Sequence, residues 1–145
     1  MNYIVLGKEA EFYVAYYLSK LGYEASVVNH QGYDIVAEVK NKTIKVEVKG
    51  SRSKIKDRNG FRFATKQGAY KNKRYLTQQM NSHIVAFCCM MDTPRIFFKP
   101  THKITSISHS IYSIHFQNKD LEKESFEQSL KQISQVVYLQ ASSET

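Results

Sequence analysis

The sequence lacks the features that mark disulfide-stabilised, membrane-spanning and secreted proteins. Its 2 cysteines, Cys88 and Cys89, are adjacent and lie in an apolar stretch, which indicates buried thiols in a reducing compartment. No apolar run approaches the roughly 18 residues that a membrane-spanning helix needs. The acidic Glu9 comes too early for a secretory signal peptide. We therefore expect a cytoplasmic protein without a membrane partner.

Two common kinds of functional site are also missing. The sequence has no glycine-rich phosphate-binding loop, which argues against nucleotide hydrolysis. Four histidines lack metal-ligand spacing to a carboxylate or cysteine, and we expect structural or surface roles for them: His83, His102, His109 and His115. With 145 residues and no repeat or linker, the chain is expected to form one domain over residues 1–139 and a frayed tail over residues 140–145.

The segment from Thr43 to Gly50 alternates with a period of two, which predicts a strand with one apolar and one charged face. The apolar face carries Ile44, Val46 and Val48, and the charged face carries Lys45, Glu47 and Lys49. An apolar run from Tyr33 to Val39, which Asp34 opens, is expected to pair with this strand through a turn at Asn41–Lys42.

This hairpin would bring chemically useful groups together. Asp34 and Glu47 would converge on one metal ion with Lys49 beside them, and the backbone carbonyl of Val48 would be a further ligand. Glu38 and Lys45 are expected to form an exposed cross-strand pair instead.

A helix is predicted from Gly7 to Gly22, because apolar residues recur at the spacing of one buried stripe. The stripe contains Ala10, Val14, Leu18 and Leu21. Glu11 lies beside it near the helix start and is a third candidate ligand, with Glu9 on the same turn as the alternative. A favourable interaction with the helix dipole would equally explain a glutamate there.

The remaining pattern predicts an α/β fold. Strands are expected at 24–29, 61–65, 83–91, 95–99 and 110–116, a helix at 118–134, and helix plus loop at 66–80. The 61–65 strand is expected to join the hairpin. The 83–91 strand is apolar throughout, which is typical of a strand covered on both faces.

The arrangement of Gly32-Tyr33-Asp34, twelve further residues, and Glu47-Val48-Lys49 resembles the bipartite motif of the PD-(D/E)xK nuclease superfamily, with Tyr33 in place of the proline. The helix at Gly7–Glu11 and the Gly22-Tyr23 pair are similar to those of archaeal Holliday junction resolvases and small intron-encoded homing endonucleases. The resemblance covers roughly residues 7–68. It implies a restriction-endonuclease-like fold, a single domain with a mixed central sheet flanked by helices: the first helix and the segment after Phe63.

The resemblance also implies site roles. Glu11, Asp34 and Glu47 would bind Mg²⁺, with Mn²⁺ as the alternative, and Lys49 would assist catalysis. A divalent cation held by carboxylates suits phosphodiester hydrolysis, since it helps form hydroxide and neutralises the charge of the phosphate.

The net charge of +8 indicates an anionic partner, because the excess lies in one stretch after the predicted catalytic strand. Between Lys49 and Arg74 there are ten basic residues and a single acidic one, Asp57. We predict that this stretch binds DNA. The alternative is a solvent-exposed loop that binds no ligand. The predicted DNA-binding residues are Arg52, Lys54, Lys56, Arg58, Arg62, Lys66, Gln67, Lys71, Lys73 and Arg74.

The resulting hypothesis is a metal-dependent endonuclease acting on duplex DNA with sequence specificity, as homing and restriction enzymes do. A structure-selective junction resolvase and a non-catalytic DNA-binding module are the alternatives. Cutting both strands requires two sites, so we expect a homodimer or a higher symmetric oligomer. The segment 83–98 or the C-terminal segment is the predicted interface.

Overall fold

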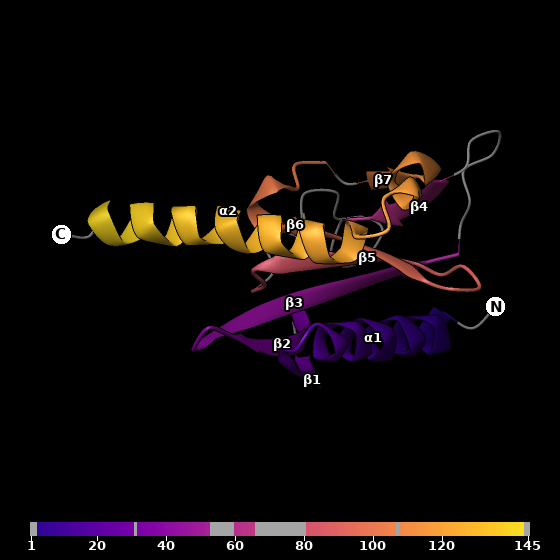
Figure 1. The fold of residues 1–145 in the computed structure, drawn as a ribbon, viewed down its shortest axis with the longest axis horizontal. Coiled ribbons are helices and arrows are strands. Elements are labelled where there is room, and N and C mark those ends of the chain that lie inside the picture. The colour runs from indigo at the N-terminus through magenta and orange to yellow at the C-terminus, as the bar shows by residue number, and fades with distance from the viewer. Residues whose placement is uncertain (1–2, 31, 53–59, 66–80, 107, 144–145) are drawn as a thin grey trace, which may run out of the picture.

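The computed structural model describes residues 3–30, 32–52, 60–65, 81–106 and 108–143 (Figure 1). Within these residues the α-helices are α1 (Tyr3–Lys20) and α2 (Leu121–Ser143). The strands are β1 (Glu24–His30), β2 (Tyr33–Val39), β3 (Lys42–Ser51), β4 (Gly60–Ala64), β5 (Ile84–Cys89), β6 (Arg95–Pro100) and β7 (Ser108–Tyr112). Two short 3-10 helices, η2 (Thr101–Lys103) and η3 (Ser113–Gln117), flank β7.

A five-stranded mixed sheet forms the centre of the fold, in the order β1-β2-β3-β5-β6. Only the β3–β5 pair is parallel among the neighbours in this sheet. The predicted β2–β3 hairpin is present, but Val39 pairs with Lys42, so the two-residue turn is Lys40–Asn41, one residue earlier than expected. Both turn residues have positive φ, 50° and 66°, as the tightest hairpin turns require.

Both helices contribute to one apolar core against the same face of the sheet. Helix α1 begins four residues before the predicted start, and Ala10, Val14 and Leu18 of its predicted stripe are fully buried. From α2, Phe126 and Ile133 join the same core. In Figure 1, α1 lies alongside β1–β3 and α2 lies alongside β5 and β6. The expected restriction-endonuclease-like architecture, a mixed central sheet with helices packed against it, is therefore confirmed.

Side chains of α2 cover the edge strand β6. The backbone N–H groups of Ile96 and Phe98 donate hydrogen bonds to Glu122 Oε2 (3.1 Å) and to Ser125 Oγ (3.0 Å). Glu122 is only 4% exposed, and the guanidinium of Arg95 neutralises it with Nε 2.7 Å from Oε2. Capping an edge in this way satisfies groups that would otherwise invite pairing with another chain. Helix α2 continues to Ser143, past the expected start of the tail at residue 140, and its end projects beyond the sheet (Figure 1).

The second face of the sheet is covered by a separate two-stranded sheet, β4–β7, and two predictions are corrected here. Residues 61–65 were expected to join the hairpin, yet β4 pairs with the distant β7, with Gly60 opposite Tyr112. The strand expected at 110–116 begins earlier and ends at Tyr112, where η3 follows. The second flanking layer is thus a small sheet, and the segment predicted at 66–80 lies outside the described residues.

Strand β5 is buried at all six positions, as its continuous apolar sequence predicts. Alternate residues Ile84, Ala86 and Cys88 face the core under the helices, and their neighbours face the core under β4 and β7. Both thiols are free, and burial raises the pKa of Cys88 to about 12. Within the described residues, no helix is long and apolar enough to cross a bilayer.

Candidate active site

The aspartate of the predicted motif is held where β2 and β3 stop pairing through their backbones. The described ladder reaches the Ile35–Val46 pair, and just beyond it the side chain of Asp34 accepts a hydrogen bond from the Val48 N–H, 2.8 Å from Oδ2. In an extended strand the N–H and C=O of one residue point toward the same neighbour. The Val48 carbonyl, predicted as a ligand, therefore points toward the Asp34 side of β3.

Glu47 is the most strongly perturbed carboxylate of the site. Its side chain is 13% exposed, that of Lys49 is 21% exposed, and Lys49 Nζ lies 3.5 Å from Glu47 Oε1. Burial, followed by the charge of Asp34, raises the pKa of Glu47 from 4.5 to about 7, although Lys49 acts in the opposite direction. A nearby negative charge disfavours ionisation of a carboxyl group, so Glu47 is poised to gain or lose a proton near neutral pH.

Glu11 reaches the site because α1 lies very close to β3. A β-carbon added at Gly50 would lie 2.8 Å from Cβ of Ala10, so only glycine allows this approach. Glu11 follows Ala10, and burial, followed by the charge of Asp34, raises the pKa of its carboxyl group. Oε2 of Glu11 is buried and has no hydrogen-bond partner among the residues that the structure describes. A buried oxygen without a partner is costly unless something else satisfies it.

The four predicted site residues therefore interact in series: Glu11 with Asp34, Asp34 with Glu47, and Glu47 with Lys49. The described part of the chain contains no group of three or more His, Cys, Asp or Glu residues with the spacing of a formed metal site. The carboxylates thus influence one another in pairs. In donor chemistry they fit a hard divalent cation, which prefers carboxylate and carbonyl oxygens and would satisfy the unpartnered Glu11 oxygen.

Glu9, the alternative ligand, has a different partner. Its Oε2 lies 2.8 Å from Arg52 Nη2, and the two side chains are 46% and 43% exposed. Arg52 follows β3 closely and belongs to the predicted DNA-binding set. Arg62, another member, is exposed on β4. Its backbone carbonyl accepts a hydrogen bond from Ser51 Oγ at the end of β3. The other members lie outside the described residues: Lys54, Lys56, Arg58, Lys66, Gln67, Lys71, Lys73 and Arg74.

One group beside the site was misassigned from the sequence. Lys45 was expected to pair with Glu38, but Glu38 accepts a hydrogen bond from Thr43 (2.7 Å), and Lys45 Nζ lies 5.1 Å from the centre of the Tyr33 ring. The only sequence signal was the alternation that sets Lys45 on the same strand face as Glu47. His83, expected to be structural, accepts a hydrogen bond at Nδ1 from the Lys45 N–H (2.9 Å).

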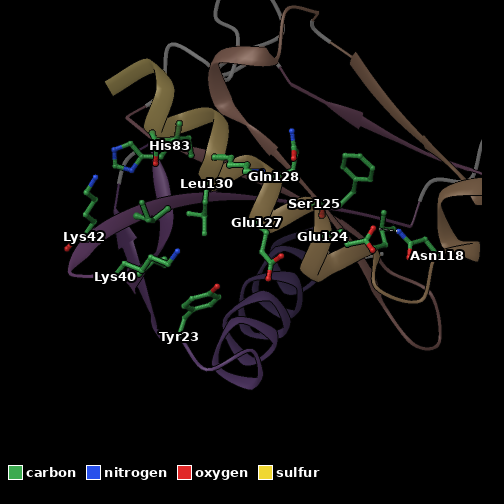
Figure 2. A pocket seen from close by; sticks show the side chains of 18 residues that line it. Tyr23, Lys40, Lys42, His83, Asn118, Glu124, Ser125, Glu127, Gln128 and Leu130 are labelled. Carbon is green, nitrogen blue, oxygen red and sulfur yellow. Dashed lines mark hydrogen bonds between the residues drawn. The ribbon is translucent and has the colours of Figure 1, made fainter. Parts of the chain in front are cut away.

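A large groove of about 1290 Å³ lies elsewhere, between α2 and the turn of the β2–β3 hairpin. Figure 2 shows Lys40 of the turn and Lys42, the first residue of β3, on one side of it and Glu127 and Gln128 of α2 on another. Asp34 and Glu47 lie at the other end of the same hairpin and are not part of its lining. The groove and the predicted site residues are therefore separate features of the fold.

Comparison with solved structures supports the fold. A bacterial homing endonuclease aligns with a TM-score of 0.54 and 13% sequence identity, over 77% of this chain and 75% of that chain. This chain has the restriction-endonuclease-like fold. A Holliday junction resolvase from the archaeal hyperthermophile Archaeoglobus fulgidus aligns with a TM-score of 0.45 and 16% identity, over 77% of this chain and 87% of that chain. No protein-family model matches the sequence, and no curated protein matches it.

The restriction-endonuclease-like fold inferred from the motif is thus confirmed by the arrangement of the elements. Within this fold, α1, β2 and β3 supply Glu11, Asp34, Glu47 and Lys49. The likeness to the homing endonuclease, at 13% sequence identity, establishes the fold of this chain and does not establish its activity. The activity of this site therefore depends on its own side chains.

Proposed function

We propose that this protein is a metal-dependent endonuclease that hydrolyses phosphodiester bonds of duplex DNA with sequence specificity. The observation that carries this proposal is the series of three interacting carboxylates beside one lysine. The pKa of Glu47 is about 7, and a buried oxygen of Glu11 has no partner within the described part of the chain. A module that only binds DNA gains nothing from clustered carboxylates, because they repel phosphate unless a cation lies between them.

In this proposal Asp34, Glu47 and Glu11 hold Mg²⁺, with Mn²⁺ as the alternative, and the Val48 carbonyl is a further ligand. The bound cation would supply positive charge for the phosphate and lower the pKa of a water molecule. Glu47 binds a cation only after losing its proton, so its pKa of about 7 makes uptake favourable at and above neutral pH. The Val48 N–H holds Asp34 in place through its hydrogen bond to Oδ2.

In this proposal Lys49 acts on the phosphate. Its ammonium lies 3.5 Å from Glu47 Oε1, so it would stand beside a phosphate bound at the carboxylates. A fixed positive charge there stabilises the negative charge that develops as the phosphodiester bond is attacked. Arg52 and the basic stretch that follows β3 would bind the DNA backbone. We also propose a symmetric homodimer, since two sites are needed to cut both strands.

The test is a cleavage assay on plasmid, linear duplex and a four-way junction in the presence of Mg²⁺. We expect Glu47→Ala and Lys49→Ala to lower the cleavage rate by at least ~100-fold while DNA binding persists. Glu38→Gln is the matched control, because Glu38 is an exposed carboxylate on the same hairpin. If both alanine variants cut as fast as the native chain, these residues do not carry catalysis.

A further inference from the structure

Three neighbouring strands each contribute one group to a stack beside the site. The rings of His30 from β1 and Tyr33 from β2 are nearly parallel, with centres 4.3 Å apart and an interplanar angle of 12°. Lys45 of β3 places its ammonium 5.1 Å from the centre of the Tyr33 ring. A cation over an aromatic face is attracted by the ring's charge distribution. The ammonium is thereby held at the residue that directly precedes Asp34 in the chain.

Both backbone hydrogen-bonding groups of Lys45 are bonded to a single residue, His83. Its N–H donates to Nδ1 of His83 (2.9 Å), and its carbonyl accepts from the N–H of His83 (2.8 Å). Burial, followed by the charge of Lys45, lowers the pKa of His83, which keeps the ring neutral and able to accept this hydrogen bond at pH 7. The root of the Lys45 side chain is therefore held firmly on β3.

The charge of Lys45 is left uncompensated, unlike that of Lys49. Among the described residues, Lys45 forms no ion pair with a carboxylate, whereas Lys49 lies 3.5 Å from Glu47. Its side chain is only partly exposed. A positioned ammonium without an anionic partner at the edge of a phosphate-processing site is suited to an anion that arrives with the substrate.

The spacing along β3 suggests which anion this is. Residues two apart on a strand share a face and lie roughly 7 Å apart, so Lys45 precedes Glu47 in the same row as Lys49. A nucleic-acid strand carries one negative charge about every 3.4 Å along its axis. A DNA strand whose scissile phosphate lies at Glu47 and Lys49 would therefore bring a nearby phosphate of the same DNA strand within reach of Lys45.

We propose that Lys45 binds a phosphate of the cleaved strand within two nucleotides of the bond that is cut, and that Tyr33 positions its ammonium for this contact. The ligand is a backbone phosphodiester of the same strand. This inference rests on the proposed nuclease function, and it adds a substrate-binding role for one residue that the motif does not include.

The first test measures how the affinity for duplex DNA depends on salt, without divalent cations. We expect Lys45→Gln to reduce the magnitude of the slope of log affinity against log salt by about 1, the change expected for the loss of one phosphate contact. In cleavage with Mg²⁺, KM should rise by about 10-fold and kcat should stay within a few-fold, because the contact forms when substrate binds. Lys42→Gln is the matched control, since Lys42 is an exposed lysine at the far end of the same strand, and it should change neither quantity.

The second test uses duplexes in which single phosphates near the mapped cleavage position are replaced by neutral methylphosphonates. One replacement should weaken binding by the native protein and cause no further loss in Lys45→Gln. Tyr33→Phe should retain native KM because it keeps the ring, whereas Tyr33→Leu should raise KM. A structural role alone would produce no loss tied to one phosphate position.

The outcomes separate this inference from the proposed function. If the native protein cuts DNA and Lys45→Gln keeps the native salt slope and methylphosphonate profile, the Lys45 contact is refuted and the nuclease proposal stands. If the native protein binds DNA without cutting it, there is no cleaved bond beside which Lys45 could bind, and both proposals are overturned. If it binds no DNA, both proposals are overturned.

Discussion

Replacing Glu47 by glutamine should stabilise the metal-free protein while abolishing cleavage. Burial and the charge of Asp34 raise the pKa of Glu47 from 4.5 to about 7 in the folded protein. Between these two values the folded state holds a proton that the unfolded state has released. The free energy of unfolding must therefore fall as pH rises through this window.

The size of the effect follows from the shift. Each pKa unit corresponds to about 1.4 kcal/mol, so a rise from 4.5 to about 7 amounts to about 3 kcal/mol of lost stability once Glu47 is fully ionised. Glutamine has the shape of the protonated acid and carries no charge. Glu47→Gln should match the native protein below pH 4.5 and exceed it by up to about 3 kcal/mol above pH 7, or a Tm higher by roughly 5–10 °C.

The assay is urea unfolding at pH 4.5 and pH 8 in the presence of a chelator. Glu38→Gln serves as the control, because this exposed carboxylate should shift stability little at either pH. Adding Mg²⁺ should then stabilise the native protein and leave Glu47→Gln unchanged, since only the native site binds the ion. If Glu47→Gln is no more stable than the native chain at pH 8, burial and the charge of Asp34 do not raise the pKa of Glu47 as described.

Two further predictions concern how α1 serves the site. Glu11→Gln should weaken Mn²⁺ binding by at least ~10-fold, measured calorimetrically at pH 7.5. Glu9→Gln removes only the partner of Arg52 and should leave Mn²⁺ affinity unchanged. Equal affinities for the two variants would exclude Glu11 as a ligand. Gly50→Ala should cost roughly 1–3 kcal/mol in urea unfolding and reduce cleavage, because its β-carbon meets Ala10 at 2.8 Å. Ala10→Gly in the same chain should restore the cleavage rate, and a fully native Gly50→Ala variant would contradict this packing.

Local patterns predicted the hairpin well because they depend on neighbours in the chain. Alternation placed Val46 in the core and left Glu47 and Lys49 together on the other face of one strand. The turn was misplaced by one residue, since Lys40 and Asn41 rather than Asn41 and Lys42 adopt positive φ. A period-two pattern indicates which residues face the core and leaves the register open to such a shift.

Long-range pairings were the part that the pattern did not predict. Strand β4 has the alternation of a hairpin strand, yet its partner is β7, which follows it by more than forty residues. Alternation records that one face is buried and contains no information on which strand buries it. The same limit explains why Lys45 was assigned to Glu38 when its ammonium in fact contacts Tyr33.

The sequence by itself determined which side chains could form the site, because the spacing of Asp34, Glu47 and Lys49 on two adjoining strands is a local property of the chain. Only the tertiary structure decided that Glu11 joins them, since its position depends on α1 packing against Gly50. The raised pKa of Glu47 likewise arises from burial and from Asp34 on another strand. Burial and charge at a point in space are sums over segments that folding brings together, and no single segment of the sequence contains them.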